Sequence, residues 1–477
     1  MTSNLTVNKF REDGVFYYGN FKGYLSFFMI KVLRKTSFSL ILSVTFLLLL
    51  SSVTISSTVS AANLMDIYQE ALEKDAQYQS ARAAYRAAQE KTAQGRAGLL
   101  PNINLSAVRQ VQEVDTTLGP AVTINNRGVT ISATQPLIRF ENFVIYSQSK
   151  TEVSRAESEF VVAAQDLILR VAQAYFDVLD AQVDVEVAEA QKEAILMQLE
   201  QAKRNFEVGV ATIVDTNEAQ ARFDLTISQE IAARNALEVR KRTLQGIINR
   251  FPEQLARTHQ ISTDLPALRY GSMEEWVIAA EEKNFALKIQ QAAYELASKE
   301  VKKTWSQHYP TVDLVAQYTD QTGVGAAITG RGIDLTSKSI GLQLNLPLFQ
   351  GGGTQSRVRE ALANQERARH DLENIRRNTT IQARQQYLNV TNGIAQVKAL
   401  KQALVSSQSQ LDSTMLGQEV GVRTEVDVLN AQQQLYSARR DLAKAYHNYL
   451  MSRLRLSAEA GELDEEVLQQ INAMLRG

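Results

Sequence analysis

The hydrophobic and polar positions of this 477-residue chain follow two different periods. Over four segments apolar and polar residues alternate, most clearly in 339–348 and more weakly before residue 140. A period of two is typical of a β-strand with one apolar face. The pattern predicts strands at 102–112, 128–137, 311–322 and 339–348.

The two strand pairs are each joined by a segment rich in Gly, Thr and Asn, and we expect loops at 113–127 and 323–337. A strand of about ten residues with one apolar face has the pattern of a transmembrane β-strand. A half-buried strand of a soluble sandwich alternates in the same way. Aromatic residues gather where the strands end, as in an interfacial belt, which favours the membrane; they are Phe140, Phe143, Trp305, Tyr309 and Phe349.

The rest of the chain has the composition of long helices. No proline lies between Leu137 and Phe251 or after Pro347, and good helix formers dominate these stretches. A helix over 141–207 alone would be about 100 Å long. We expect helices at 64–98, 141–207, 213–250, 273–308, 355–416 and 425–458.

The chain also repeats itself after about 212 residues. The segment VGVATIVD at 208–215 returns as VGVRTEVD at 420–427, and Tyr175 returns as Tyr387. This spacing exceeds the roughly 20–50 residues of a solenoid unit and indicates a duplicated half-protein. The expected structural repeats are 62–271 and 272–477.

Four strands cannot close a barrel, since transmembrane barrels need at least about eight. An open sheet edge in lipid would leave backbone N–H and C=O groups without partners. We therefore expect the chain to form oligomers, with eight strands in a dimer or twelve in a trimer. The fold expected is mainly α, with a small transmembrane β part and two structural repeats.

Residues 1–61 resemble a targeting segment. Lys and Arg residues at 31–35 precede an apolar run at 40–53, and small residues follow as far as Ala61. This order is typical of a secretory signal peptide, and Met29 is an alternative translation start. The other interpretation is a membrane anchor, but the apolar run is shorter than the ~20 residues that a spanning helix needs.

Composition excludes several kinds of site. The chain has no cysteine, its formal net charge is −1, and its four histidines are dispersed. We therefore expect no disulfide, no metal site, no cofactor and no nucleic-acid partner. Gly351–Gly353 lacks the Lys-Ser/Thr of a phosphate-binding loop, and no catalytic motif is present, so we expect no enzyme.

The two glycine turns are the strongest candidate sites. Gly209 and Gly421 each separate two predicted helices, where glycine favours a left-handed helix end. Asp215 and Asp427 follow, and Glu218 shares a helical face with Asp215. These acids either complement helix dipoles or, in a symmetric oligomer, form rings around an axis.

The duplicated halves, the paired hairpins and the Val-Gly-x-x-Thr-x-x-Asp turns resemble the TolC family of outer-membrane efflux proteins over essentially all of 62–477. The resemblance implies a trimer with a twelve-stranded β-barrel and a long α-helical barrel that crosses the periplasm. It also implies an iris-like gate, periplasmic adaptor proteins and an inner-membrane ABC or RND-type transporter. Outer-membrane lipid would surround the strands.

The same resemblance assigns residue roles. Asp427 matches the first acid of a pore constriction, and Asn430 stands where a second acid is common. Arg423 matches a residue of the closed gate, and Gln418 stands where a Tyr is frequent. The full expected constriction is Asp427, Asn430, Asp215 and Glu218, and the expected adaptor-docking residues are Val208, Gly209, Thr212, Val420, Gly421 and Thr424.

The function expected from the sequence is a passive exit duct in the outer membrane, extending into the periplasm and serving a tripartite efflux pump or a type I secretion system. One alternative is a duct dedicated to type I protein secretion. The other is a structural scaffold that spans the periplasm without a pore.

The targeting pattern yields the first prediction. We expect cleavage after Ala61, so that N-terminal sequencing of protein from the membrane fraction begins at Ala62. Recovery of Lys31 or Arg34 in the mature protein would contradict it.

Overall fold

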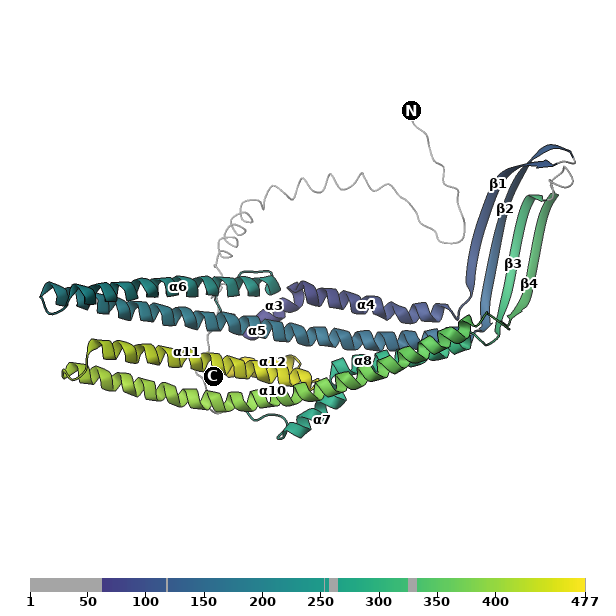
Figure 1. Cartoon of the computed structure of the whole chain (residues 1–477). Helices are drawn as coiled ribbons and strands as arrows, with labels where there is room; N and C mark the ends of the chain where they lie inside the picture. The colour runs from purple at the N-terminus through teal and green to yellow at the C-terminus, as the bar shows by residue number, and fades with distance from the viewer. Residues whose placement is uncertain (1–61, 117–118, 253, 257–264, 325–332, 477) are drawn as a thin grey trace, which may run out of the picture. The chain divides into compact units, whose positions relative to one another are not determined.

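The computed structural model describes residues 62–476, apart from 117–118, 253, 257–264 and 325–332. The targeting segment 1–61 lies outside the described residues. Within 62–476, a four-stranded sheet lies at one end of a layer of long helices, and two helical turns lie at the other (Figure 1). The described helices include none that is apolar over a length sufficient to span a bilayer.

The helices of each half follow the predicted plan. In the first half, α3 (Leu64–Lys74) and α4 (Ala76–Ala97) precede the strands, and α5 (Phe140–Glu207) and α6 (Ile213–Ile248) follow them. In the second half the corresponding helices are α7 (Met273–Lys283), α8 (Phe285–Ser306), α10 (Gly353–Glu419) and α11 (Glu425–Glu459). The two longest, α5 and α10, have 68 and 67 residues, and each is therefore about 100 Å long.

The shorter helices pack along the long ones. Both α4 and α6 lie against α5, while α7, α8 and α11 lie against α10. Helix α5 also contacts α8 and α11, so it joins the two halves. Four residues of α11 are spaced by seven and are all buried, so they form a packing seam; they are Val428, Leu435, Leu442 and Tyr449.

Two of the helix predictions were wrong, because the expected single helices 64–98 and 273–308 are each divided. Asp75 and Asn284 adopt extended backbone angles, end one helix and cap the next. The side chain of Asp75 accepts the N–H of Tyr78, and that of Asn284 accepts the N–H of Leu287. Since no Pro or Gly marks either break, composition gave no warning of it.

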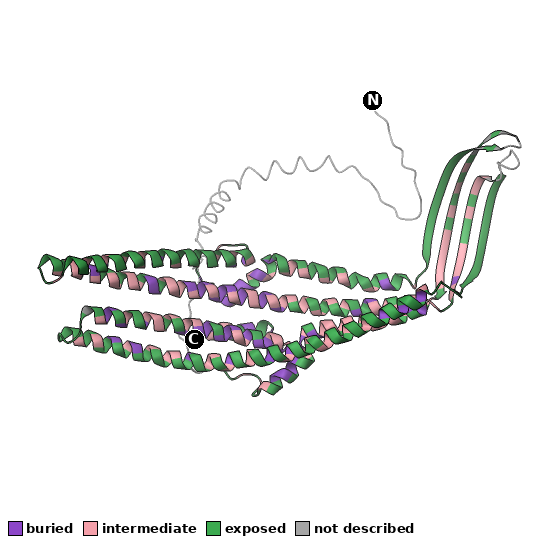
Figure 2. Ribbon diagram, viewed as in Figure 1, coloured by how far each residue is buried: buried purple, intermediate pink, exposed green. Residues whose placement is uncertain are grey.

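A further helix, α12 (Glu465–Arg476), was not predicted. Leu468, Ile471 and Leu475 occupy its apolar face and are buried. They join the main hydrophobic core, which α3, α5, α11 and the end of α6 also supply. Buried residues are concentrated in this middle part of the helical layer and are sparse near the turns (Figure 2).

The sheet is antiparallel in the order β1-β2-β3-β4, so β1 and β4 are its edges. Its strands are longer than the alternation indicated, namely β1 (Asn102–Thr116), β2 (Gly119–Ile138), β3 (Thr311–Val324) and β4 (Ile333–Asn345). Most of the loop expected at 113–127 is therefore paired strand, and the expected loop 323–337 is strand in its described residues. Gly, Pro, Thr and Asn interrupt the apolar residues of these segments, which weakens the period of two.

The register separates an apolar face from a polar one. Residues paired across antiparallel strands share a face. One row of the apolar face contains Ile103, Ala133, Ala316 and Ile340, and one row of the polar face contains Asn104, Ser132, Gln317 and Ser339. The apolar side chains project from the sheet, and Ile340 is 76% exposed. The exposed ring of Phe140 meets Tyr309 edge to face at the base of the sheet.

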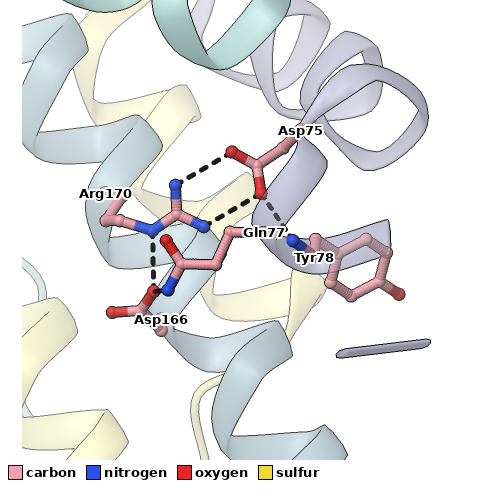
Figure 3. Close-up of polar contacts among 5 residues, drawn as sticks. All are labelled: Asp75, Gln77, Tyr78, Asp166 and Arg170. Carbon is pink, nitrogen blue, oxygen red and sulfur yellow. Dashed lines mark hydrogen bonds and ion pairs between the residues drawn. The ribbon is translucent and has the colours of Figure 1, made fainter. Parts of the chain in front are cut away.

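An ion-paired cluster fixes the break between α3 and α4 (Figure 3). The guanidinium of Arg170 donates to both carboxylate oxygens of Asp75, at 2.9 and 3.1 Å, and to Asp166 at 2.7 Å. Burial alone would raise the pKa of Asp75, but the hydrogen bonds from Arg170 and from the Tyr78 N–H hold the pKa below its ordinary value. The cluster therefore stabilises an almost fully buried carboxylate.

A ladder of polar contacts joins α5 to α11. Asp180 of α5 lies 2.7 Å from Nδ1 of the buried His447, whose ring stacks on Phe176. One turn toward the helix tips, the Lys444 ammonium lies 2.9 Å from Asp184. These contacts hold the two halves together where the core ends.

The second prediction concerns the Arg170 cluster. Arg170→Met should lower the free energy of unfolding by about 3 kcal/mol, because it leaves the Asp75 carboxylate buried without its cation. The stability that Asp75 contributes is present above its unfolded-state pKa and is lost as pH falls through its depressed folded-state pKa, so Arg170→Met should also reduce the loss of stability in acid.

Denaturant unfolding of the detergent-solubilised protein at several pH values measures both effects. Arg155→Met is the matched control, since the pair of Arg155 with Glu159 lies in the same helix at 2.9 Å but is exposed and is worth about 0–1 kcal/mol. Equal destabilisation by the two substitutions would show that burial of Asp75 is not what matters.

Candidate functional site: the two helical turns

The turns at the helix tips have the same backbone conformation. Val208 and Val420 both have φ −90°, and Gly209 and Gly421 have φ 79° and 77°. The N–H of each glycine donates to the carbonyl three residues earlier, and the next N–H donates to the carbonyl five residues earlier. This is the Schellman motif, which requires a left-handed residue and so favours glycine.

A capping box starts each returning helix. The hydroxyl of Thr212 accepts the N–H of Asp215, and the Asp215 carboxylate accepts the Thr212 N–H at 2.7 Å. Thr424 and Asp427 repeat the arrangement, with the Thr424 N–H donating to the carboxylate at 2.9 Å. Each box satisfies backbone donors that a helix end otherwise leaves free. Helix capping is thus observed for both acids, and it leaves other carboxylate lone pairs free.

The capping bonds also keep both acids ionised. The hydrogen bond from the Thr212 backbone, followed by that from its hydroxyl, lowers the pKa of Asp215. The corresponding bonds from Thr424 lower the pKa of Asp427, and the charge of Arg423 adds to the effect. The carboxylates therefore remain negative at pH values where an ordinary Asp begins to take up a proton.

The expected constriction residues are divided among different surfaces of one chain. Asp215 and Glu218 line a cleft of about 410 Å³ between the two hairpins, together with Thr424. Asn430 lines a second cleft of about 290 Å³, which shares Arg222 with the first. Glu218 is paired with Arg222 at 2.6 Å. Asp427 is half-buried and lines neither cleft.

The two expected gate residues have different surroundings. The Arg423 N–H donates to the carbonyl of Gly417, and Cγ of Arg423 would lie 2.7 Å from a Cβ placed on that glycine. The Arg423 side chain thus lies over Gly417. The Gln418 side chain is exposed, and among the described residues it forms no hydrogen bond with Arg423.

Sequence reasoning missed part of this site. Gly417 was overlooked, although the first repeat has Asn205 at the same offset, and that difference was a usable signal. It also missed exposed apolar residues beside those it named; the most exposed are Val210, Ile213, Val214 and Val422. The expected docking residues Val208 and Val420 are exposed as well, at 73% and 66%.

Comparison with known proteins decides the family. The sequence profile described as "Outer membrane efflux protein" matches residues 67–250 and 276–462, which is most of both halves. The chain belongs to the outer membrane efflux protein family. This membership, with outer-membrane relatives over most of the chain, places the protein in the outer membrane, extending into the periplasm.

Similar proteins cover nearly the whole chain. The outer membrane protein TolC of Vibrio cholerae is 33% identical over 427 residues, covering 89% of this chain and 96% of that protein. The alkaline protease secretion protein AprF of Pseudomonas aeruginosa is 32% identical, covering 87% of each. The crystal structure of the Campylobacter jejuni CmeC outer membrane channel matches with a TM-score of 0.71 at 16% identity, covering 87% of this chain and 89% of that one, which shows the shared fold.

Proposed function

We propose that this protein is the passive exit duct of an export system and acts as a homotrimer. The observation that carries the proposal is the sheet, which has one apolar face, one polar face and two unpaired edges, β1 and β4. In lipid both edges require partners. Pairing β4 of one copy with β1 of the next satisfies them and turns the polar face into the lining of a channel.

Barrel size favours three copies. Two copies would give eight strands, and an eight-stranded barrel is just wide enough for its own side chains to fill. Three copies give twelve strands and a wider, open interior. Each copy would add its polar rows, such as Ser106, Thr130, Thr319 and Ser337, to the wall.

The helical turns suit the attachment of partner proteins. Each copy presents two tips of the same backbone shape, so a trimer offers six similar sites. Exposed valines on rigid Schellman turns would dock helical hairpin tips of a periplasmic adaptor, which would connect the duct to an inner-membrane ABC or RND-type transporter. The duct is proposed to be passive, so the energy for export would come from that transporter.

A duct dedicated to protein secretion is the second candidate. It is favoured by similarity to AprF, a protease secretion protein, over most of both chains. Export of a fluorescent drug and of a protein substrate, measured in one host that lacks its own duct, separates the candidates. The scaffold alternative predicts no conductance for the purified protein in planar bilayers.

The third prediction tests docking. Gly209→Arg and Gly421→Arg should leave trimers intact but abolish export, because a long charged side chain would cover the apolar tip. A Cβ at either glycine meets no atom within 4 Å, so the structural cost is limited to the left-handed backbone, about 1–2 kcal/mol.

Gly246→Arg is the control, since Gly246 is also open to solvent but lies within α6. Trimer content is measured by gel, adaptor contact by crosslinking, and export by cargo release. Normal crosslinking and export in both tip variants would exclude docking at these turns.

The fourth prediction concerns the constriction, for which we propose Asp427, Asn430, Asp215 and Glu218, with Arg423 and Gln418 at the gate. Carboxylates gathered near one axis concentrate cations, and several oxygens together bind multivalent ions. Asp427→Asn should sharply weaken block by a trivalent cation added on the periplasmic side and lower cation selectivity. Asn430→Asp should strengthen both.

Single-channel conductance in planar bilayers measures both quantities. Asp412→Asn, which removes an exposed carboxylate of α10 away from the turn, is the control. Unchanged block in Asp427→Asn would leave this carboxylate with its capping role alone.

A further inference from the structure

Two arginines face each other on the lipid-facing side of the sheet. Arg109 of β1 is paired with Arg127 of β2, and that row continues to Thr322 of β3. Along β2, residues of this face are spaced by two, so Arg127 shares it with Val129 and Ile131. The arginine row thus lies just beyond the apolar rows, on the side away from the helices.

This pairing is unfavourable without an anion. Like charges directly opposite each other on neighbouring strands destabilise a sheet. Arg127 donates from Nε to the Thr322 hydroxyl at 2.9 Å, which fixes its guanidinium but neutralises no charge. In the described part of the chain, no carboxylate oxygen lies within 4.0 Å of either guanidinium.

Acidic residues on the same face do not remove the repulsion within the chain. Asp320 lies one row nearer the helices, opposite Val129, and its carboxylate accepts the Thr336 hydroxyl at 3.5 Å. Asp334 lies two positions from Thr336 on the edge strand β4. Both arginine side chains are exposed, so their remaining N–H groups face the medium around the sheet.

The part of the membrane that surrounds the arginine row indicates which anion it binds. The protein belongs to the outer membrane, and the strand ends away from the periplasmic helices reach the outer leaflet. Basic residues beside an apolar membrane surface attract anionic lipid headgroups. Two guanidinium forks side by side match the oxygens of a phosphate, which accepts paired N–H donors.

We propose that Arg109 and Arg127 bind a phosphate group of an outer-leaflet glycolipid. Lys338 lies on the same face, in the row of Ile131 and Tyr318, with its ammonium 5.8 Å from the centre of the Tyr318 ring. It places a third cation within the apolar rows, on the edge strand β4. The site follows from the outer-membrane location and does not depend on the proposed export function.

The test measures retained lipid on the purified full-length oligomer. Wild type and Arg109→Gln/Arg127→Gln are incubated with lipopolysaccharide in detergent, separated by size exclusion, and assayed for lipid bound per protein. Because each cation near an anionic surface strengthens lipid binding, the double variant should bind the lipid at least about tenfold more weakly. Arg109→Lys/Arg127→Lys should retain part of the binding.

Two controls define specificity. Arg82→Gln removes an exposed arginine from α4, outside the sheet, and should leave binding unchanged. Enzymatically dephosphorylated lipopolysaccharide should bind the wild type as weakly as intact lipid binds the double variant, while inorganic phosphate at the same concentration should not displace intact lipid.

Three results would overturn the proposal. Equal lipid retention by the double variant and the wild type would exclude the arginines. Full displacement by inorganic phosphate would show a free-anion site. The third result is unchanged lipid binding in the double variant together with dissociation of its oligomers. If the oligomers of Asp334→Asn dissociate as well, the arginines pair with a neighbouring copy's carboxylates.

Discussion

The backbone groups along the outer edges of β1 and β4 set the conditions for the rest of this molecule. In water an unpaired strand edge is tolerable, but in a bilayer every free N–H and C=O is costly. The described residues of one chain form four strands, so a membrane-inserted sheet requires other copies. The division into an apolar and a polar face then decides which side meets lipid and which encloses water. Helices that continue from such a closed ring are themselves arranged as a ring.

Duplication gives one chain two similar sets of long helices, but equivalent positions of the two halves carry different side chains. The break before α4 is held by the ion pair of Asp75 with Arg170, whereas the equivalent break before α8 uses Asn284, whose amide donates to the carbonyl of Glu459. At the tips, Arg423 lies over Gly417 in the second turn, while the first turn has Ala211 and Asn205 there. The two turns thus have the same backbone geometry, but the second carries the positive charge of Arg423 and the first has Ala211 in its place.

Sequence patterns predicted an element correctly where a single local property marks it, such as the absence of proline, a glycine, or the alternation of apolar and polar residues. The absence of proline located α5 and α10 to within a few residues, and glycine located both turns. Alternation revealed the strands only where apolar residues recur at every second position. The strand extensions at 113–116 and 119–127 were not recognised, because Gly, Pro, Thr and Asn interrupt their apolar residues. The helix breaks at Asp75 and Asn284 depend on contacts with distant helices, and so does the burial of α12. The cleft that joins Asp215 to Thr424 depends on how two hairpins pack, which no local pattern encodes.

The ladder of Asp180 with His447 and Asp184 with Lys444 has a mechanical consequence. It lies where the core ends, and the two clefts lie between the hairpins on its tip side. From Lys444 to the start of α11 the helix extends for about 28 Å at 1.5 Å per residue. If α11 pivots at the ladder, a rotation of about ten degrees there moves the tip by about 5 Å, roughly one helical turn. Small changes among a few ion-paired side chains would then be amplified at the far end.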